Sequence, residues 1–167
     1  MKAGVKIIGV KELIRNLERL GGNVQEASVE ALWTGGAHLE GAAKEKLSQA
    51  GTGRMYKTGR KGTRYATHQA STPGEPPAVD TGELRASVTH NVTGRVGKDL
   101  PDPGGSKTKV KGYVGTNLDH GLYTELGTSR MEARPWLYPT IMEEASNVAK
   151  LIQNVLKRAI AKVKRKK

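Results

Sequence analysis

The residues most able to do chemistry are the four histidines and the acidic residues near them, because His titrates near neutral pH and also ligates metals. The tightest grouping is Asp119-His120 with Glu125. Triplets of this kind arise often by chance, so we expect a polar turn leading into Tyr123. The chain has no cysteine and no two histidines at metal-ligand spacing, which excludes disulfides and speaks against zinc. The histidines are His38, His68, His90 and His120.

A glycine-rich basic run over residues 53–63 superficially resembles a phosphate-binding loop. Such a loop needs Gly-x-x-x-x-Gly-Lys-Ser/Thr after a buried strand, and neither the spacing nor the strand is present. The isolated serines lack the context of a nucleophile elbow. We therefore find no catalytic constellation, expect no cofactor and predict that the protein is not an enzyme.

Positive charge is the strongest bias of the composition: 28 Lys and Arg against 16 Asp and Glu leave a net charge of +12. Nucleic acid or an acidic protein surface is the expected neighbour. On nucleic acid, the basic run would neutralise phosphates without reading sequence, and Tyr56 and Tyr65 could stack on bases. A solvated arm, or an arm docked on an acidic protein, is the commoner alternative. The candidate partner or DNA contacts are Arg54, Lys57, Arg60, Lys61 and Arg64.

The length of 167 residues fits one domain, 1–167, with a basic tail at 164–167. Aromatic residues are scarce, so the core must be thin and a homo-oligomer would supply further burial. No apolar run approaches the roughly 20 residues that span a bilayer, and no signal-peptide core follows Met1. We expect an intracellular protein with no membrane contact.

Helical periodicity predicts helices over 10–20, from Asn23 to about 49, and from Pro139 to about 163. Gly35-Gly36 should weaken the second helix. The third helix carries the clearest apolar stripe, with Pro139 at its first position and Thr140 to Glu143 as a capping box.

Strands are predicted at 5–9, 87–93 and 107–116, the last two forming a long antiparallel hairpin. The alternation of Val88, His90 and Val92 with polar residues predicts a half-buried strand. Residues 50–79, rich in Gly, Pro and basic residues, read as a flexible arm or long hairpin that orders on a partner. The predicted fold is α+β: a small antiparallel sheet packed against two or three helices, plus an extended basic arm.

Two boxes marked by proline and glycine carry most of the remaining information, one at 73–87 and one at 123–128 followed by 134–137. Pro76-Pro77 favours an extended approach and Thr81-Gly82 a sharp turn, so that Leu84 enters the core. Asp80 and Glu83 have capping-box spacing.

The second box has its own turn chemistry. We expect Glu125 to cap a neighbouring backbone or to pair with Arg134, and Gly127 to permit a turn. Trp33 and Trp136 should be core or interface anchors.

The order and content of these boxes resemble the tail-completion, or minor tail-component, family of long-tailed bacteriophages, whose members act at the head–tail junction. The resemblance runs from about residue 5 to 163. It departs from the family where Thr124 replaces an alanine, while Trp136 fills an aromatic position, and the basic arm is longer than expected. The matching positions are Pro76, Pro77, Thr81, Gly82, Leu84, Tyr123, Glu125, Gly127, Thr128, Arg134, Pro135 and Trp136.

The resemblance implies a structural virion protein at the neck, active in tail completion or tail-to-head joining as a ring, with six subunits expected. Its partners would be the tail tube, tail terminator or connector proteins, with non-specific contact to packaged DNA. It would reside in the virion and, during assembly, in the host cytoplasm. The alternative is a small basic nucleic-acid-binding protein of ribosomal or nucleoid type, which the net charge favours and the two boxes disfavour.

Overall fold

The computed structural model describes residues 24–58, 66–94 and 110–165. The predicted strand at 5–9 and helix at 10–20 lie outside the described residues, as do Arg60, Lys61 and Arg64. The elements in chain order are α2 (Val24–Lys46), β1 (Met55–Thr58), β2 (Ala66–Gln69), α3 (Glu83–Ser87), β3 (Thr89–Val92), β4 (Gly112–Gly115), α4 (Asp119–Leu126) and α5 (Leu137–Arg165).

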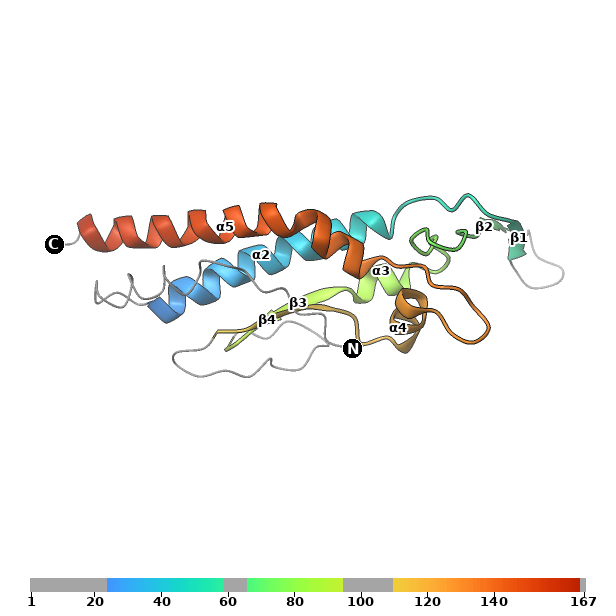
Figure 1. The fold of residues 1–167 in the computed structure, drawn as a ribbon, viewed down its shortest axis with the longest axis horizontal. Coiled ribbons are helices and arrows are strands. Elements are labelled where there is room, and N and C mark those ends of the chain that lie inside the picture. The colour runs from blue at the N-terminus through green and yellow to red at the C-terminus, as the bar shows by residue number, and fades with distance from the viewer. Residues whose placement is uncertain (1–23, 59–65, 95–109, 166–167) are drawn as a thin grey trace.

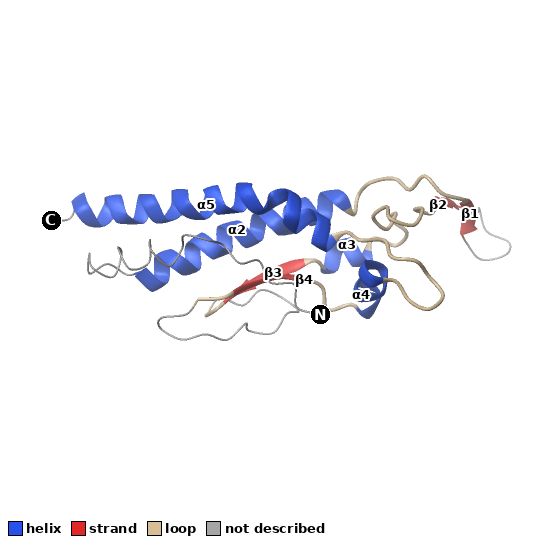
Figure 2. Ribbon diagram, viewed as in Figure 1, coloured by secondary structure: helices blue, strands red, loops and turns tan. Residues whose placement is uncertain are grey.

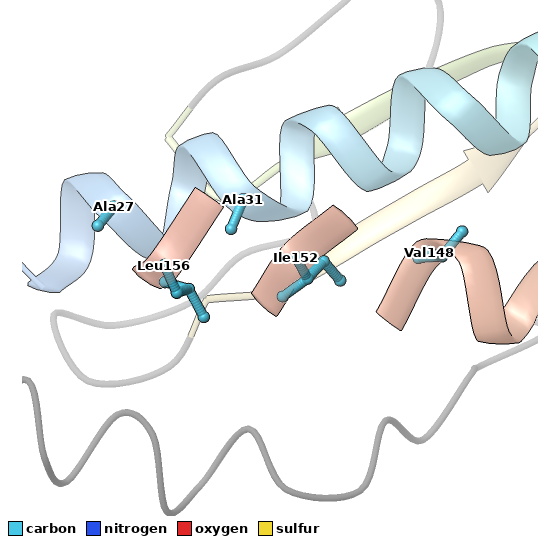
Figure 3. Close-up of a cluster of buried hydrophobic side chains, with 5 residues drawn as sticks. All are labelled: Ala27, Ala31, Val148, Ile152 and Leu156. Atoms are coloured by element: carbon cyan, nitrogen blue, oxygen red, sulfur yellow. The ribbon is translucent and has the colours of Figure 1, made fainter. Parts of the chain in front are cut away.

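Helices α2 and α5 lie side by side along the long axis of the molecule (Figure 1). Small residues on α2 face larger aliphatic residues on α5, which lets the two backbones approach. The apolar stripe predicted for the last helix is confirmed as its buried face. The helix seam consists of Ala27, Ala31, Val148, Ile152 and Leu156 (Figure 3).

The strands β3 and β4 pair antiparallel, from Thr89 opposite Gly115 to Val92 opposite Gly112, and pack against α2 (Figure 2). The α+β fold with a small sheet on helices is therefore confirmed. Gly36 of α2 faces this sheet, where a Cβ would lie 2.9 Å from Cδ2 of His90. The glycine pair predicted to weaken α2 thus includes a position where it permits close packing.

The burial of β3 differs from the half-buried strand that the alternation predicts. Asn91 is fully buried although it is polar, and so are His90 and Val92. Asn91 has interaction partners within the protein. A polar residue can be buried when it is partnered, so residue type did not mark the solvent side here.

The arm at 50–79 contains a hairpin, β1–β2, with Met55 opposite Gln69 and Thr58 opposite Ala66. Two more backbone hydrogen bonds extend it towards the body, from the Gly53 N–H to Ala70 O and from the Ala70 N–H to Arg54 O. The hairpin lies beyond the ends of the helices, at the end of the molecule opposite the C-terminus (Figure 1).

Both predicted capping boxes are wrong. Gly82, with φ of 81°, takes the N-cap position of α3, and the oxygen that accepts the Glu83 N–H is Oγ1 of Thr81 rather than the Asp80 carboxylate. Helix α5 begins at Leu137, so Pro139 stands inside the first turn. Thr140 Oγ1 therefore donates to Trp136 O at 2.6 Å instead of capping.

Candidate functional site

The two boxes come together in space, and their contact is the box junction. The Gly74 N–H donates to Ala133 O at 3.0 Å. The Arg134 guanidinium donates to Ser71 O at 3.3 Å, and the Arg134 backbone N–H donates to Thr124 O at 2.7 Å. Arg134 thereby ties the end of the second box both to α4 and to the residues just before the first box.

The carboxylate of Glu125 caps α5 from the neighbouring helix α4. It accepts the backbone N–H groups of Trp136 at 2.7 Å, Leu137 at 2.9 Å and Tyr138 at 2.8 Å. The first turn of a helix leaves such N–H groups unpaired, and the helix dipole favours a negative charge there. The prediction that Glu125 caps a neighbouring backbone is confirmed.

Trp136 is the apolar centre of the box junction, with 1% of its surface exposed. It packs with Ala43, Leu47 and Val88, and Leu84 lies against the same cluster as predicted. The indole N–H donates to Gly121 O at 3.3 Å, so the buried polar atom is satisfied. The second box thus contributes both a cap and a core anchor.

Gly121, which the sequence did not single out, is required for this packing. A Cβ at this position would lie 2.4 Å from Cγ2 of Thr116 and 3.0 Å from Cδ1 of Leu84. The residue is buried in α4, where a polar turn was predicted. A glycine within an otherwise helical octapeptide is the signal that could have marked it.

A second carboxylate clamp, at Glu75, also escaped the sequence analysis. Its carboxylate accepts the Thr52 hydroxyl at 2.5 Å and the Thr72 N–H at 2.9 Å. These hydrogen bonds, the Thr52 hydroxyl foremost, lower the pKa of Glu75 from 4.5 to about 2. The Thr72-Pro-Gly-Glu75 turn was the available signal, since Glu75 N also donates to Thr72 O at 3.1 Å.

The remaining box residues serve as turns or lie at the surface. Gly127 has φ of 76° and its N–H closes α4 on Tyr123 O at 2.9 Å. Thr128 N donates to Met131 O at 2.7 Å. Tyr123 itself is half exposed and Thr81 is exposed, whereas three further box residues are half-buried, namely Pro76, Pro77 and Pro135.

A hollow of about 370 Å³ opens between the first box and α4. Its lining includes Val79, Asp80, Glu83, His120 and Thr124. Among its lining residues, two carboxylates, Asp80 and Glu83, stand beside one guanidinium, Arg85, in a protein of net charge +12. The hollow therefore has one more acidic than basic side chain in its lining.

The grouping Asp119-His120 with Glu125 does not assemble into a site, because the Glu125 carboxylate is occupied by the α5 amides. The other histidine–carboxylate pairs join core elements. His90 Nδ1 lies 2.6 Å from Glu40, and His38 Nε2 lies 2.6 Å from Glu144. Within residues 24–58, 66–94 and 110–165, no group of three His, Asp or Glu side chains could hold a metal ion.

In both pairs the pKa of the carboxylate is lowered, as is expected of a structural contact. Burial alone would raise the pKa of Glu40, but hydrogen bonds with Lys44 and His90 outweigh burial and lower it. The hydrogen bond with His38, assisted by Asn147, lowers the pKa of Glu144. Both carboxylates are therefore held ionised, as scaffold partners require.

Two of the five basic candidates lie in the described part of the hairpin. Arg54 and Lys57 are exposed, and the Arg54 guanidinium carbon lies 5.7 Å from the Tyr56 ring centroid. Met55 and Tyr56 beside them are 55% and 49% exposed. These two candidates, Arg54 and Lys57, therefore lie on the hairpin and not among the residues of the box junction.

Comparisons of the chain with protein-family models, with curated proteins and with solved structures found no match. Among the described helices, none is long and apolar enough to cross a membrane.

Proposed function

We propose that the protein is a non-enzymatic structural component of the head–tail junction of a long-tailed bacteriophage, acting as a ring in tail completion or tail-to-head joining. The proposal starts from the resemblance of the two boxes to that family. The observation that carries it further is the Glu125 cap, through which α4 holds the N-terminus of α5. The box residues thus have scaffold roles, as expected of an assembly protein.

The distribution of polar groups favours assembly over catalysis. The Glu75 carboxylate accepts hydroxyl and backbone donors of the same chain, and the Glu125 carboxylate accepts three backbone N–H groups. A catalytic carboxylate needs a free oxygen facing a substrate. The exposed features are instead a basic hairpin and an acidic hollow, which are surfaces for macromolecules.

Light scattering of the purified protein tests the proposal, at low and high salt, with and without duplex DNA, and with tail-tube protein added. A ring of defined mass, or a monomer that forms rings when tail-tube protein is present, supports it. A complex with any duplex DNA that dissolves steeply with salt, without self-assembly or a tail partner, would favour the nucleic-acid binder instead.

A further inference from the structure

Among the described elements, the β1–β2 hairpin packs against no helix or other strand to any substantial extent. The substantial packing of each strand is with the other strand, and Met55 and Tyr56 remain about half exposed. A two-stranded hairpin is marginally stable by itself in water. Apolar side chains on such a projection are typical of a segment that is covered by another molecule.

The charges of the hairpin narrow the choice of partner. From residue 50 to residue 74 the chain has no acidic residue, whereas it has five basic residues. The partner surface should therefore be acidic, with an apolar recess for Met55 or Tyr56.

The hollow at the box junction has these properties. Its lining combines apolar Leu47 and Val79 with exposed Asp80 and Glu83. Arg85 also lines it, and its guanidinium donates to Ser48 Oγ at 3.1 Å. Within the described part of the chain, neither carboxylate takes part in a salt bridge, so both are available to an incoming cation. Its volume of about 370 Å³ lies in the range of sites that receive a side chain or small ligand.

We infer that the hairpin of one copy docks into the hollow between the first box and α4 of a second copy. Side chains alternate along the strand, so Tyr56 enters the hollow with Arg54 beside it, or Met55 enters with Lys57 beside it, and that cation faces Asp80 and Glu83 of the second copy. Because the hairpin and the hollow are different surfaces, the contact is head-to-tail. Any open row of subunits therefore has an unoccupied hairpin at one end and an unoccupied hollow at the other. Head-to-tail contacts close into rings when the rotation permits, so the inference rests on the proposed ring and names its contact.

Two full-length variants test this contact by sedimentation velocity. Met55→Ser with Tyr56→Ser removes the apolar part of the hairpin, and Asp80→Lys with Glu83→Lys reverses the charge of the hollow. Each variant should weaken self-association about tenfold or more, as loss of central interface residues does. A 1:1 mixture should form a dimer and nothing larger, because one intact hairpin meets one intact hollow.

Matched controls separate the contact from general effects of charge or hydrophobicity. Glu30→Lys with Glu45→Lys makes the same charge change at exposed positions of α2, and Met142→Ser removes an equally exposed apolar residue of α5. Both should associate as the unmodified protein does, and circular dichroism should show folded chains throughout.

Other outcomes overturn the inference in distinguishable ways. A defined oligomer that survives both variants overturns the hairpin contact and leaves the proposed ring intact. A protein that is monomeric at every concentration, yet forms rings with tail-tube protein, also removes the contact without removing the function. Loss of duplex DNA binding in the hairpin variant, with no self-association at all, overturns both.

Discussion

The box junction and the helix seam stabilise the same molecule by different means. The seam joins α2 to α5 through Ala and aliphatic side chains, whose packing has no preferred direction. The box junction joins α4 to α5 through a carboxylate that accepts three backbone N–H groups and through one buried Trp. The seam should therefore tolerate changes that conserve volume, whereas the junction should respond to the loss of a single charge or to one added methyl group.

The largest effect is expected from Trp136→Ala at the box junction. Removal of a fully buried indole leaves a cavity, and such changes lower the free energy of unfolding by about 3–5 kcal/mol. Urea denaturation followed by circular dichroism measures it. A loss below about 1 kcal/mol would mean that Trp136 is not the centre of this cluster.

Gly121→Ala should destabilise the box junction by about 1–3 kcal/mol, because the added Cβ has no room beside Thr116 and Leu84. Gly41→Ala is the matched control. A Cβ on Gly41, exposed in the middle of α2, meets no atom within 4 Å, so this change should stabilise by about 0.5–1 kcal/mol. In thermal denaturation, Gly121→Ala should lower the melting temperature and Gly41→Ala should raise it. Changes of the same sign would contradict the close packing around Gly121.

Glu125→Gln keeps the shape of the cap but removes its charge and replaces one accepting oxygen with a donor. Since caps contribute about 0.5–2 kcal/mol, we expect a loss of about 1–2 kcal/mol in urea denaturation. Glu83→Gln, at an exposed position, should change stability by less than about 0.5 kcal/mol. If Glu125→Gln and Glu83→Gln had the same free energy of unfolding, the hydrogen bonds of Glu125 would contribute nothing to stability.

Ile152→Val tests the helix seam with an expected loss of stability similar to that of Glu125→Gln. The loss of one buried methylene group should cost about 0.5–1.5 kcal/mol, through packing alone. A cost at Ile152 that exceeded the cost at Glu125 would reverse the comparison between seam and junction.

The smallest and most local effect is expected at Glu75, whose pKa falls from 4.5 to about 2 in the folded chain. A depressed pKa means that the clamp on Thr52 and Thr72 contributes above pH 4.5 and is lost as pH falls through about 2. NMR of the Thr72 amide should report the loss. In Glu75→Gln that resonance should no longer follow this titration, and a midpoint near 4.5 in the unmodified protein would contradict the clamp.

Local sequence patterns predicted the long helix α5 but did not predict the short helix α4. The stripe of α5 was visible because 29 residues repeat the helical pattern many times. Helix α4 has only eight residues, Leu118 at its N-cap without a side-chain cap, and Gly121 inside. Those features argue against a helix locally. The hydrogen bond from the Trp136 indole N–H to Gly121 O, which joins residues distant in sequence, stabilises it instead.

In the candidate site, too, some contacts could be predicted from local sequence and others could not. Glu125 was predicted to cap a backbone, but which helix it caps depends on the approach of α4 to α5. Asp80 and Thr140 had capping-box spacing and do not cap. Gly82 takes the N-cap position of α3, and Glu125 accepts the N–H groups at the start of α5. The Glu75 clamp joins Thr52 to the first box across 23 residues, beyond the reach of any local pattern.

The sequence by itself determined the fold class, the amphipathic face of α5, the antiparallel pairing of β3 with β4 and the concentration of positive charge on the arm. These follow from periodicity and composition, which are properties of neighbouring residues. Only the tertiary structure decided which N–H groups the carboxylates accept, why Gly121 has no side chain, and that the basic hairpin and the acidic hollow lie on separate surfaces. Those contacts join residues far apart along the chain, so their geometry exists only once the helices have packed.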